Sequence, residues 1–334
     1  MTLGNSKPCL TGGVLAGNGK IYGIPGVLPI RLNFVPINEC TEATTKLLVI
    51  DPTTNTVESL YVGWHGVGGV LADNGKIYSI PLFVSPNRGM LIIDPTTNAI
   101  DTTTIYAETS AVITGGVLAD NGKIYGIPFD NGGAVLVVDP STNATTIIRA
   151  LEGSSPPGGQ SVGGVLAGNG KIYGIPYSTG SLLIIDPATN AVDLVAYERH
   201  GYAGNSHWAG GVLGNNGKIY CIPWYANDVF VIDPMTNSTD TLPAPLGGKS
   251  KYFGGVLAAD GKIYCMPYAH EIRSVLTIDP GTGTTHFMGI ITYIDSSYGP
   301  IFCGAVQSNN GNIYGMSYTP SAVFGIAADN AALC

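Results

Sequence analysis

The chain has few charged residues. Asp, Glu, Lys and Arg make up 11% of its 334 residues, whereas an average globular domain has about 25%. The formal net charge is −8 and the basic residues form no stripe, which excludes a nucleic-acid binder because such proteins need a basic surface. No apolar run approaches the roughly 18 residues of a membrane span, so we expect no membrane insertion.

The sequence also lacks the common motifs of catalysis. It contains no Gly-x-Ser-x-Gly elbow, no phosphate-binding loop and no His-Glu-x-x-His pair, which mark many hydrolases, nucleotide-binding enzymes and zinc enzymes. The sequence has no Cys-x-x-Cys and no close pair of His, the patterns that would indicate a zinc site. His200 and His207 lie seven residues apart, in a glycine-rich segment. We therefore expect a non-enzymatic protein without a metal or other cofactor.

Glycine, by contrast, is abundant: the chain has 47, about twice the usual share of roughly 7%. Many of them belong to one phrase, GGVLAGNGKIYGIPY at residues 163–177, which recurs along the chain. A second phrase, such as VLVVDPSTN at 135–143, follows each copy, and its last version, VFGIAADN, lacks Asp-Pro. The copies of the first phrase are centred on Tyr22, Tyr78, Tyr125, Tyr173, Tyr220, Tyr264 and Tyr314.

Each repeat contains four short segments with strand character. GGVLA is followed by a turn such as Asp120-Asn121-Gly122, which is a tight hairpin signal. KIYGIP and VLVVD are rich in strand-forming residues, and the Asp-Pro turn ends in an Asn that tolerates positive φ. Four strands in each repeat of 44 to 56 residues are typical of a propeller blade. The sequence predicts an all-β, seven-bladed β-propeller with four antiparallel strands in each blade.

The repeats resemble those of NHL and YVTN-type propellers in their order of inner strand, Ile-Tyr strand and Val-Ile-Asp strand, and their Gly-Gly pair is similar to that of kelch repeats. The resemblance covers nearly the whole chain and implies a single domain over residues 1–334. The last strand is expected in AALC at 331–334, and residues 1–9 are expected to help close the ring. The predicted blades are 11–64 with an insertion at 26–46, 67–112, 114–161, 162–208, 209–252, 253–302 and 303–334.

The cysteines bear on how the ring is closed. Cys9 is expected near the last blade, in a disulfide with Cys334 or with Cys303. Cys221 and Cys265 occupy equivalent positions in neighbouring blades. Such positions should lie farther apart than the Cα separation of about 7 Å that a disulfide tolerates, so we expect these two thiols to be free and packed.

We interpret the repeated residues as scaffold. The first strand of each blade is expected to line a central channel, where Gly-Gly pairs let the backbones approach closely. The repeated Asp is expected to accept backbone N–H bonds within its own turn rather than to bind a metal, and the repeated Lys is expected to be a solvated flank of the hairpin. Asn143 and Asn237 begin glycosylation sequons at two of these turns.

Candidate binding residues lie in the connections that vary between repeats. All three Trp lie there, and an aromatic residue follows the Pro of KIYGIP in several repeats. Aromatic rings beside carboxylates and amides suit a carbohydrate or a protein partner; alternatively, these rings only fill contacts between blades. The predicted ligand-binding residues are Trp64, His65, Phe129, Asp130, Tyr177, His207, Trp208, Trp224, Tyr225, Asp228, Tyr268, His270 and Glu271.

Three functions are compatible with this architecture. The leading one is a non-enzymatic module that binds a glycan or a protein through the variable face. The second is a structural subunit that self-assembles into a larger extracellular array or filament, helped by the 26–46 insertion. The third is a lyase or lactonase at the channel mouth, where Glu271 and His270 resemble the acids and histidines that such propeller enzymes use.

The same features bear on location. The sequons, the low Lys content and the even number of cysteines favour an extracellular or cell-surface protein. The N-terminal MTLGNSKPCLTGG has no apolar segment of the kind found in a signal peptide, and a cytoplasmic location is the alternative.

Overall fold

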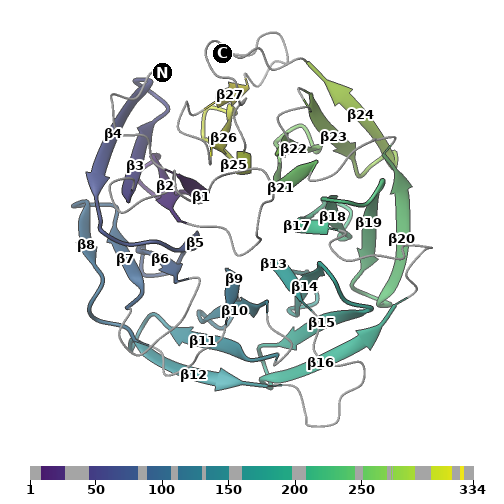
Figure 1. Cartoon of the computed structure of the whole chain (residues 1–334), viewed down its shortest axis with the longest axis horizontal. Coiled ribbons are helices and arrows are strands. Elements are labelled where there is room, and N and C mark those ends of the chain that lie inside the picture. Colours follow the sequence, from purple (N-terminus) through teal and green to yellow (C-terminus); the bar gives the residue numbers. More distant parts are fainter. Residues whose placement is uncertain are drawn as a thin grey trace.

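The computed structural model describes a ring of β-sheets around a central axis (Figure 1). All regular structure in the described residues is β-strand, and none of these residues forms a helix long and apolar enough to cross a membrane. The described residues are 9–26, 45–81, 89–106, 112–129, 133–149, 160–197, 208–244, 251–268, 272, 274–289, 302–317 and 324–326.

Six sheets have four antiparallel strands in chain order, and we call them blades 1 to 6. Blades 1 and 2 are β1 (Leu10–Leu15), β2 (Ile21–Pro25), β3 (Lys46–Asp51), β4 (Thr56–Tyr61), β5 (Val67–Leu71), β6 (Ile77–Ile80), β7 (Leu91–Asp94) and β8 (Ala99–Asp101). Blades 3 and 4 are β9 (Ile113–Leu118), β10 (Ile124–Pro128), β11 (Val135–Asp139), β12 (Ala144–Ile148), β13 (Ser161–Leu166), β14 (Ile172–Pro176), β15 (Ser181–Asp186) and β16 (Ala191–Ala196). Blades 5 and 6 are β17 (Trp208–Leu213), β18 (Ile219–Pro223), β19 (Asp228–Asp233), β20 (Ser238–Pro243), β21 (Tyr252–Leu257), β22 (Ile263–Pro267), β23 (Val275–Asp279) and β24 (Thr284–Met288).

The structure shows six complete blades rather than the seven predicted. The remaining sheet, which we call the closing sheet, has three described strands: β25 (Phe302–Gln307), β26 (Ile313–Ser317) and β27 (Phe324–Ile326). The AALC segment expected as its fourth strand lies outside the described residues. In Figure 1 the closing sheet lies between blade 6 and blade 1, and β25 packs against both β21 and β1.

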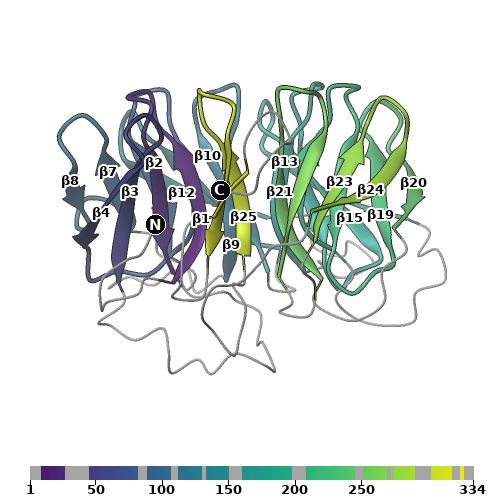
Figure 2. The same ribbon diagram turned by 90° about the horizontal axis from the view of Figure 1, so that it is seen from above.

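The repeated turns lie together on one side of the ring, which we call the repeated side (Figure 2). On this side, the repeated phrase of one blade is hydrogen-bonded to the Asp-Pro turn of the next blade. Asn169 Nδ2 donates to Pro234 O at 2.8 Å, and the Tyr173 hydroxyl donates to Asn237 Oδ1 at 2.7 Å. An equivalent Asn-to-Pro bond of 3.2 Å joins Asn310 of the closing sheet to Pro52 of blade 1. The Asn and Tyr side chains of the repeat therefore join neighbouring blades by hydrogen bonds, and we call these bonds latches.

The Asp-Pro turns have the predicted local structure. The Asp139 carboxylate accepts hydrogen bonds from the backbone N–H and the hydroxyl of Ser141, at 2.9 and 2.6 Å. These bonds hold the pKa of Asp139 below its ordinary value. Asn143 ends the turn with a φ of 60°. Asn143 and Asn237 are both exposed, and whether their sequons carry glycans stays a prediction.

Close packing of the innermost strands explains the glycine pairs. A Cβ placed on Gly210 of β17 would lie only 2.8 Å from the Cα of Gly254 in β21, and Gly210 has a φ of +78°. Each innermost strand also has an irregular register at this level, for example between Trp208 and Gly211. A side chain here would meet the backbone of the neighbouring blade, so glycine is required.

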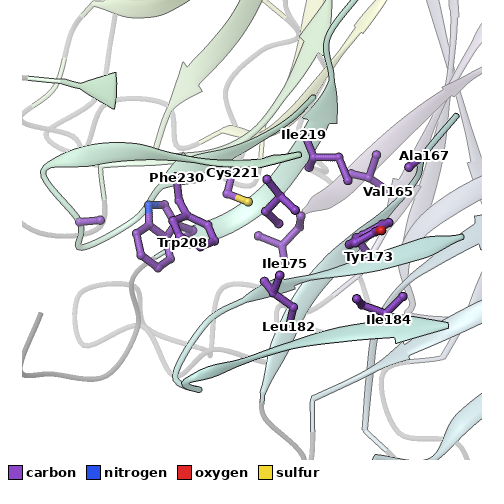
Figure 3. Close-up of a cluster of buried hydrophobic side chains, with 12 residues drawn as sticks. Val165, Ala167, Tyr173, Ile175, Leu182, Ile184, Trp208, Ile219, Cys221 and Phe230 are labelled. Atoms are coloured by element: carbon purple, nitrogen blue, oxygen red, sulfur yellow. The ribbon is translucent and has the colours of Figure 1, made fainter. Parts of the chain in front are cut away.

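Hydrophobic side chains fill the spaces between blades. Between blades 4 and 5, Tyr173 and Ile175 pack with Trp208, Cys221 and Phe230 (Figure 3). The Trp208 ring stacks on Phe230 with 4.6 Å between centroids. The core is thus divided among the junctions of the ring rather than gathered at its centre.

The structure separates the cysteine predictions. Cys221 and Cys265 are buried and free, as predicted, and Cys303 is also free. Burial raises the pKa of all three thiols. Cys9 is disulfide-bonded. Because Cys303 is free, the alternative of a Cys9–Cys303 bond was wrong; Cys334 lies outside the described residues, and its pairing with Cys9 stays a prediction.

Candidate functional site

Aromatic residues gather on the side opposite the repeated turns, which we call the variable side. They follow the second strand of successive blades and pack against the first residues of the innermost strands. This group, which we call the mouth cluster, consists of Cys9, Val162, Tyr177, Ala209, Trp224, Tyr268 and Cys303, with Phe129, Tyr225 and Phe253 packed against it. The sequence had singled out several of these residues, and the fold brings them together.

The rings of the mouth cluster contact one another. Centroids lie 4.5 Å apart for Trp224 and Tyr268, 5.6 Å for Trp224 and Phe253, and 5.5 Å for Phe129 and Tyr177. Trp224 is only 1% exposed. These rings bury one another, as in the alternative that they fill contacts between blades, while Phe129 and Tyr225 keep some exposure. Whether any of them binds a ligand stays a prediction.

Two other predicted binding residues belong to the blade cores. Trp64 is buried and its indole N–H donates to Gly89 O at 2.8 Å. Trp208 is buried and its N–H donates to Asp228 O at 3.1 Å. Their rings and donors are already used within the protein, and a role for either residue in ligand binding stays a prediction. His65 is half-buried and lies beside Trp64 in the chain, whereas the predicted site residues Asp130, His207, His270 and Glu271 lie outside the described residues.

Lys251 is a residue that the sequence reasoning missed. It immediately precedes β21, and its side chain is fully buried. Its backbone N–H donates to Trp224 O at 3.0 Å, and its carbonyl accepts from the Tyr268 N–H at 2.7 Å. The available signal was that this Lys stands outside the repeated hairpin position and directly before an innermost strand.

The Lys251 amine is held by backbone carbonyls. Its Nζ donates to Tyr225 O at 3.0 Å and to Ala226 O at 2.8 Å. Burial lowers the pKa of Lys251 to about 8, and the nearby Asp228 carboxylate partly opposes this shift. A neutral amine has two N–H bonds and one lone pair, so the two carbonyls satisfy both donors and leave the lone pair unused.

The indole N–H of Trp224, unlike the N–H groups of Lys251, is a donor without a partner in the described part of the chain. This buried donor has no hydrogen-bond acceptor among the described residues. Buried polar groups in native proteins are nearly always paired, so an unpaired one calls for an explanation. Lys251 and Trp224 are neighbours in the fold, since the Lys251 backbone N–H bonds directly to the Trp224 carbonyl.

The described residues contain no group of three His, Cys, Asp or Glu side chains placed to hold a metal ion. Lys251, Trp224 and the mouth cluster supply an amine, an indole donor and aromatic rings, with the Asp228 carboxylate near the amine. Such a site suits proton transfer or attack on an electrophilic carbon.

Comparison with known proteins gives matches of structure alone. No family model matches the chain, and neither does any curated protein. A streptogramin B lyase is similar, with a TM-score of 0.73 and 12% identity over 95% of this chain and 93% of that one. Also similar is an inactive histidine-to-alanine variant of Staphylococcus aureus virginiamycin B lyase with quinupristin, at 0.72 and 11% over 95% and 94%. Kuenenia stuttgartiensis hydrazine synthase gives 0.68 and 12% over 97% of both chains.

These neighbours correct the leading functional expectation. A non-enzymatic recognition module was expected because catalytic motifs are absent, yet these neighbours, which match the whole ring, are enzymes. Another neighbour is the extracellular domain of a two-component system protein of B. thetaiotaomicron, with a TM-score of 0.63 and 13% identity over 95% of this chain and 39% of that one. At such low identity the likeness shows the fold alone: this chain is a β-propeller.

Proposed function

We propose that this chain is an enzyme of the lyase type that works on the variable side of the ring, with Lys251 as the residue that takes up a proton. The observation that carries the proposal is the buried Lys251 amine, whose two donors are satisfied by Tyr225 O and Ala226 O. Its remaining position is a lone pair beside the mouth cluster. The whole-chain likeness to lyases supports the same reaction type.

Lyase chemistry by elimination needs a base that is partly neutral near physiological pH. A general base works best when its pKa lies near the working pH. With a pKa of about 8, about a tenth of Lys251 is neutral at pH 7, whereas an ordinary Lys of pKa about 10.4 is almost entirely protonated. In the step, the amine takes a proton from carbon, the C–H bonding pair becomes the second bond of a C=C double bond, and the ester oxygen departs with its bonding pair as a carboxylate. The Lys251 ammonium then releases its proton to water.

The location that we propose is extracellular or at the cell surface. The Cys9 disulfide supports it, because disulfides persist in oxidising compartments and are rare in the cytosol. The extracellular neighbour is compatible with it.

The test is an assay that separates elimination from hydrolysis. The chain is incubated with a panel of cyclic esters and with quinupristin, and the products are analysed by mass spectrometry. Elimination opens a ring without changing its mass and adds a double bond, whereas hydrolysis adds the mass of one water. We expect an isomeric, unsaturated product from the wild type and none from Lys251→Gln.

The matched control is Lys218→Gln. Lys218 lies in blade 5 on the repeated side, paired with Asp233 at 3.8 Å, and its replacement should leave turnover unchanged. The proposal fails if the folded wild type converts no member of the panel, if the product has gained water, or if a folded Lys251→Gln variant is as active as the wild type.

A further inference from the structure

One junction of the ring differs from the others in its hydrogen bonds. It lies between blade 6 and the closing sheet, where β21 and β22 pack against β25 (Figure 1), and we call it the seam. We propose that the ring opens reversibly at the seam, and that this opening admits solvent and small molecules to the mouth cluster from the blade 6 side. The proposed function needs such a route, because Lys251 is buried, but the opening itself does not depend on that function.

At the other junctions an Asn side chain donates across to the next blade. In blade 4, Asn169 Nδ2 donates to Pro234 O of blade 5 at 2.8 Å. In the closing sheet, Asn310 Nδ2 donates to Pro52 O of blade 1 at 3.2 Å. Equivalent bonds leave blades 1, 2, 3 and 5. The closing sheet is thus latched to blade 1 by the same kind of bond that joins complete blades.

Blade 6 has Asp260 at the position of the latch Asn. A carboxylate accepts hydrogen bonds and has no N–H to donate, so this side chain cannot form the latch bond. Its oxygens accept bonds within its own blade, from the Lys262 backbone N–H at 3.1 Å and from the Tyr264 hydroxyl at 2.8 Å. The phrase on the other side of the seam, VFGIAADN, has no Asp-Pro. The two phrases that meet at the seam therefore supply neither the Asn nor the Pro of the latch.

Apolar packing holds the described part of the seam together. Tyr264 and Met266 of blade 6 pack with Phe302 of the closing sheet. A hydrogen bond also crosses the seam, from the Ala259 backbone N–H to Gln307 Oε1 at 3.1 Å, but it is exposed, so water competes with it and it adds little stability. The seam thus has apolar packing, as other junctions do, without their Asn-to-Pro bond. We therefore expect it to open at a lower cost in free energy than the other junctions.

Opening of the seam divides the mouth cluster. Cys303 of β25 and Tyr268, which directly follows β22, both belong to this cluster. They lie on opposite sides of the seam. Separation of blade 6 from the closing sheet therefore brings water to Cys303, which is 1% exposed in the closed ring.

Three free thiols report on three places in the ring. Cys221 lies in the core between blades 4 and 5, Cys265 in the core between blades 5 and 6, and Cys303 beside the seam. All three are buried, so a thiol reagent reaches each of them only when the surrounding structure opens.

The experiment compares the rates at which these thiols are labelled in the folded full chain. The protein is incubated at pH 8 with N-ethylmaleimide, without denaturant, and the labelled residues are followed over time by peptide mass spectrometry. We expect Cys303 to be labelled about tenfold faster than Cys221 and Cys265, since its junction lacks a latch bond.

A matched variant gives a latched junction the side chain of the seam. Asn169→Asp keeps the oxygen that accepts the Lys171 N–H at 3.1 Å and removes the bond donated to Pro234 O. We expect Cys221 labelling to accelerate about tenfold, while Cys303 keeps its rate. Lys218→Gln, which changes an exposed charge on the same side of the ring, is the control and should alter none of the rates. Circular dichroism verifies that each variant is folded.

The outcomes decide for or against the seam. Equal rates for the three thiols would show that they become reachable together, by unfolding of the whole chain, and would overturn the inference. Faster labelling of Cys221 or Cys265 than of Cys303, or a Cys303 that stays unlabelled until the chain unfolds, would overturn it too. An unchanged Cys221 rate in folded Asn169→Asp would overturn the role of the missing latch. None of these results bears on elimination by Lys251, which the activity of Lys251→Gln tests, so the inference and the proposed function fail separately.

Discussion

On the repeated side of the ring, Asn169 and Tyr173 tie blade 4 to the Asp-Pro turn of blade 5, and the same bonds recur round the ring. On the variable side, by contrast, a buried Lys before an innermost strand is found in one blade of the described part of the chain. This residue, Lys251, is buried against backbone carbonyls of blade 5. On the repeated side, an Asn of each of blades 1 to 5 and of the closing sheet donates to a Pro carbonyl of the next blade. The variable side leaves a Trp224 donor unpaired. The hydrogen bonds that join blades are thus shared around the ring, whereas the buried Lys251 amine lies at one junction.

The largest expected effect comes from a substitution where two innermost strands approach each other closely. Gly210→Ala should lower the free energy of unfolding by about 3 kcal/mol, because the new Cβ meets the Gly254 backbone at 2.8 Å and the φ of +78° disfavours a side chain. Gly17→Ala is the control, since nothing lies within 4 Å of its Cβ position, and it should change stability by less than about 0.5 kcal/mol. Urea denaturation measures both. Equal effects would show that the innermost glycines are not constrained by packing.

The next effect concerns Lys251, and we expect to see it in how the stability of the folded chain depends on pH. The folded pKa of Lys251 is about 8, below the unfolded value of about 10.4, so between these values unfolding takes up a proton. The stability of the wild type relative to Lys251→Met should therefore rise by about 1.4 kcal/mol per pH unit from pH 8 to about 10, and stay level below pH 8.

Denaturation of both proteins across this pH range measures that difference, and comparison with Met removes the contributions of other groups. A flat difference for Lys251→Met would mean that the Lys251 amine keeps an ordinary pKa in the folded chain.

A smaller effect comes from one latch on the repeated side. Tyr173→Phe removes the hydroxyl that bonds Asn237 Oδ1 at 2.7 Å and should cost about 1 to 2 kcal/mol of stability. Tyr78→Phe is the matched variant in blade 2, where the hydroxyl donates only a long 3.5 Å bond to Pro140 O; we expect a smaller loss. Thermal unfolding of the two variants tests this order, and the reverse order would count against the latch.

The smallest effect is expected for the exposed ion pairs of the frame. Lys218 lies 3.8 Å from Asp233, and its side chain is 46% exposed. Lys218→Gln should change stability by at most about 0.5 kcal/mol, and less at high salt. Chemical denaturation at two ionic strengths measures this, and a loss comparable to that of Tyr173→Phe would contradict the assignment of the latches as the main ties.

The sequence predicted the parts of the fold that depend on neighbours in the chain. The Asp139 turn and the positive φ of Asn143 are local, since Asp139 bonds Ser141 two residues away. The bond from Tyr173 to Asn237 spans 64 residues, and nothing in either phrase alone indicates its partner. The prediction of blades with four strands holds for six sheets, because the repeat itself sets that pattern.

The site was harder to predict because burial depends on distant residues. Trp208 was expected to face a ligand from its place in a variable connection, yet its ring turns inward onto Phe230. Lys251 was overlooked since its burial depends on carbonyls of residues 225 and 226 in the preceding blade. The aromatic residues after the second strands were singled out from the sequence as a binding group, which stays a prediction, and their mutual burial follows only from the ring geometry.

The most direct test of this account is a measurement of the Lys251 pKa in the folded chain. Competitive acylation with trace acetic anhydride from pH 6 to 11, followed by peptide mass spectrometry, gives a titration curve for each lysine. We predict a midpoint of about 8 for Lys251, below the ordinary lysine value of about 10.4. A Lys251 midpoint at the ordinary lysine value of about 10.4, or no acylation of Lys251 until the chain unfolds, would contradict the claim that this junction holds a reactive amine.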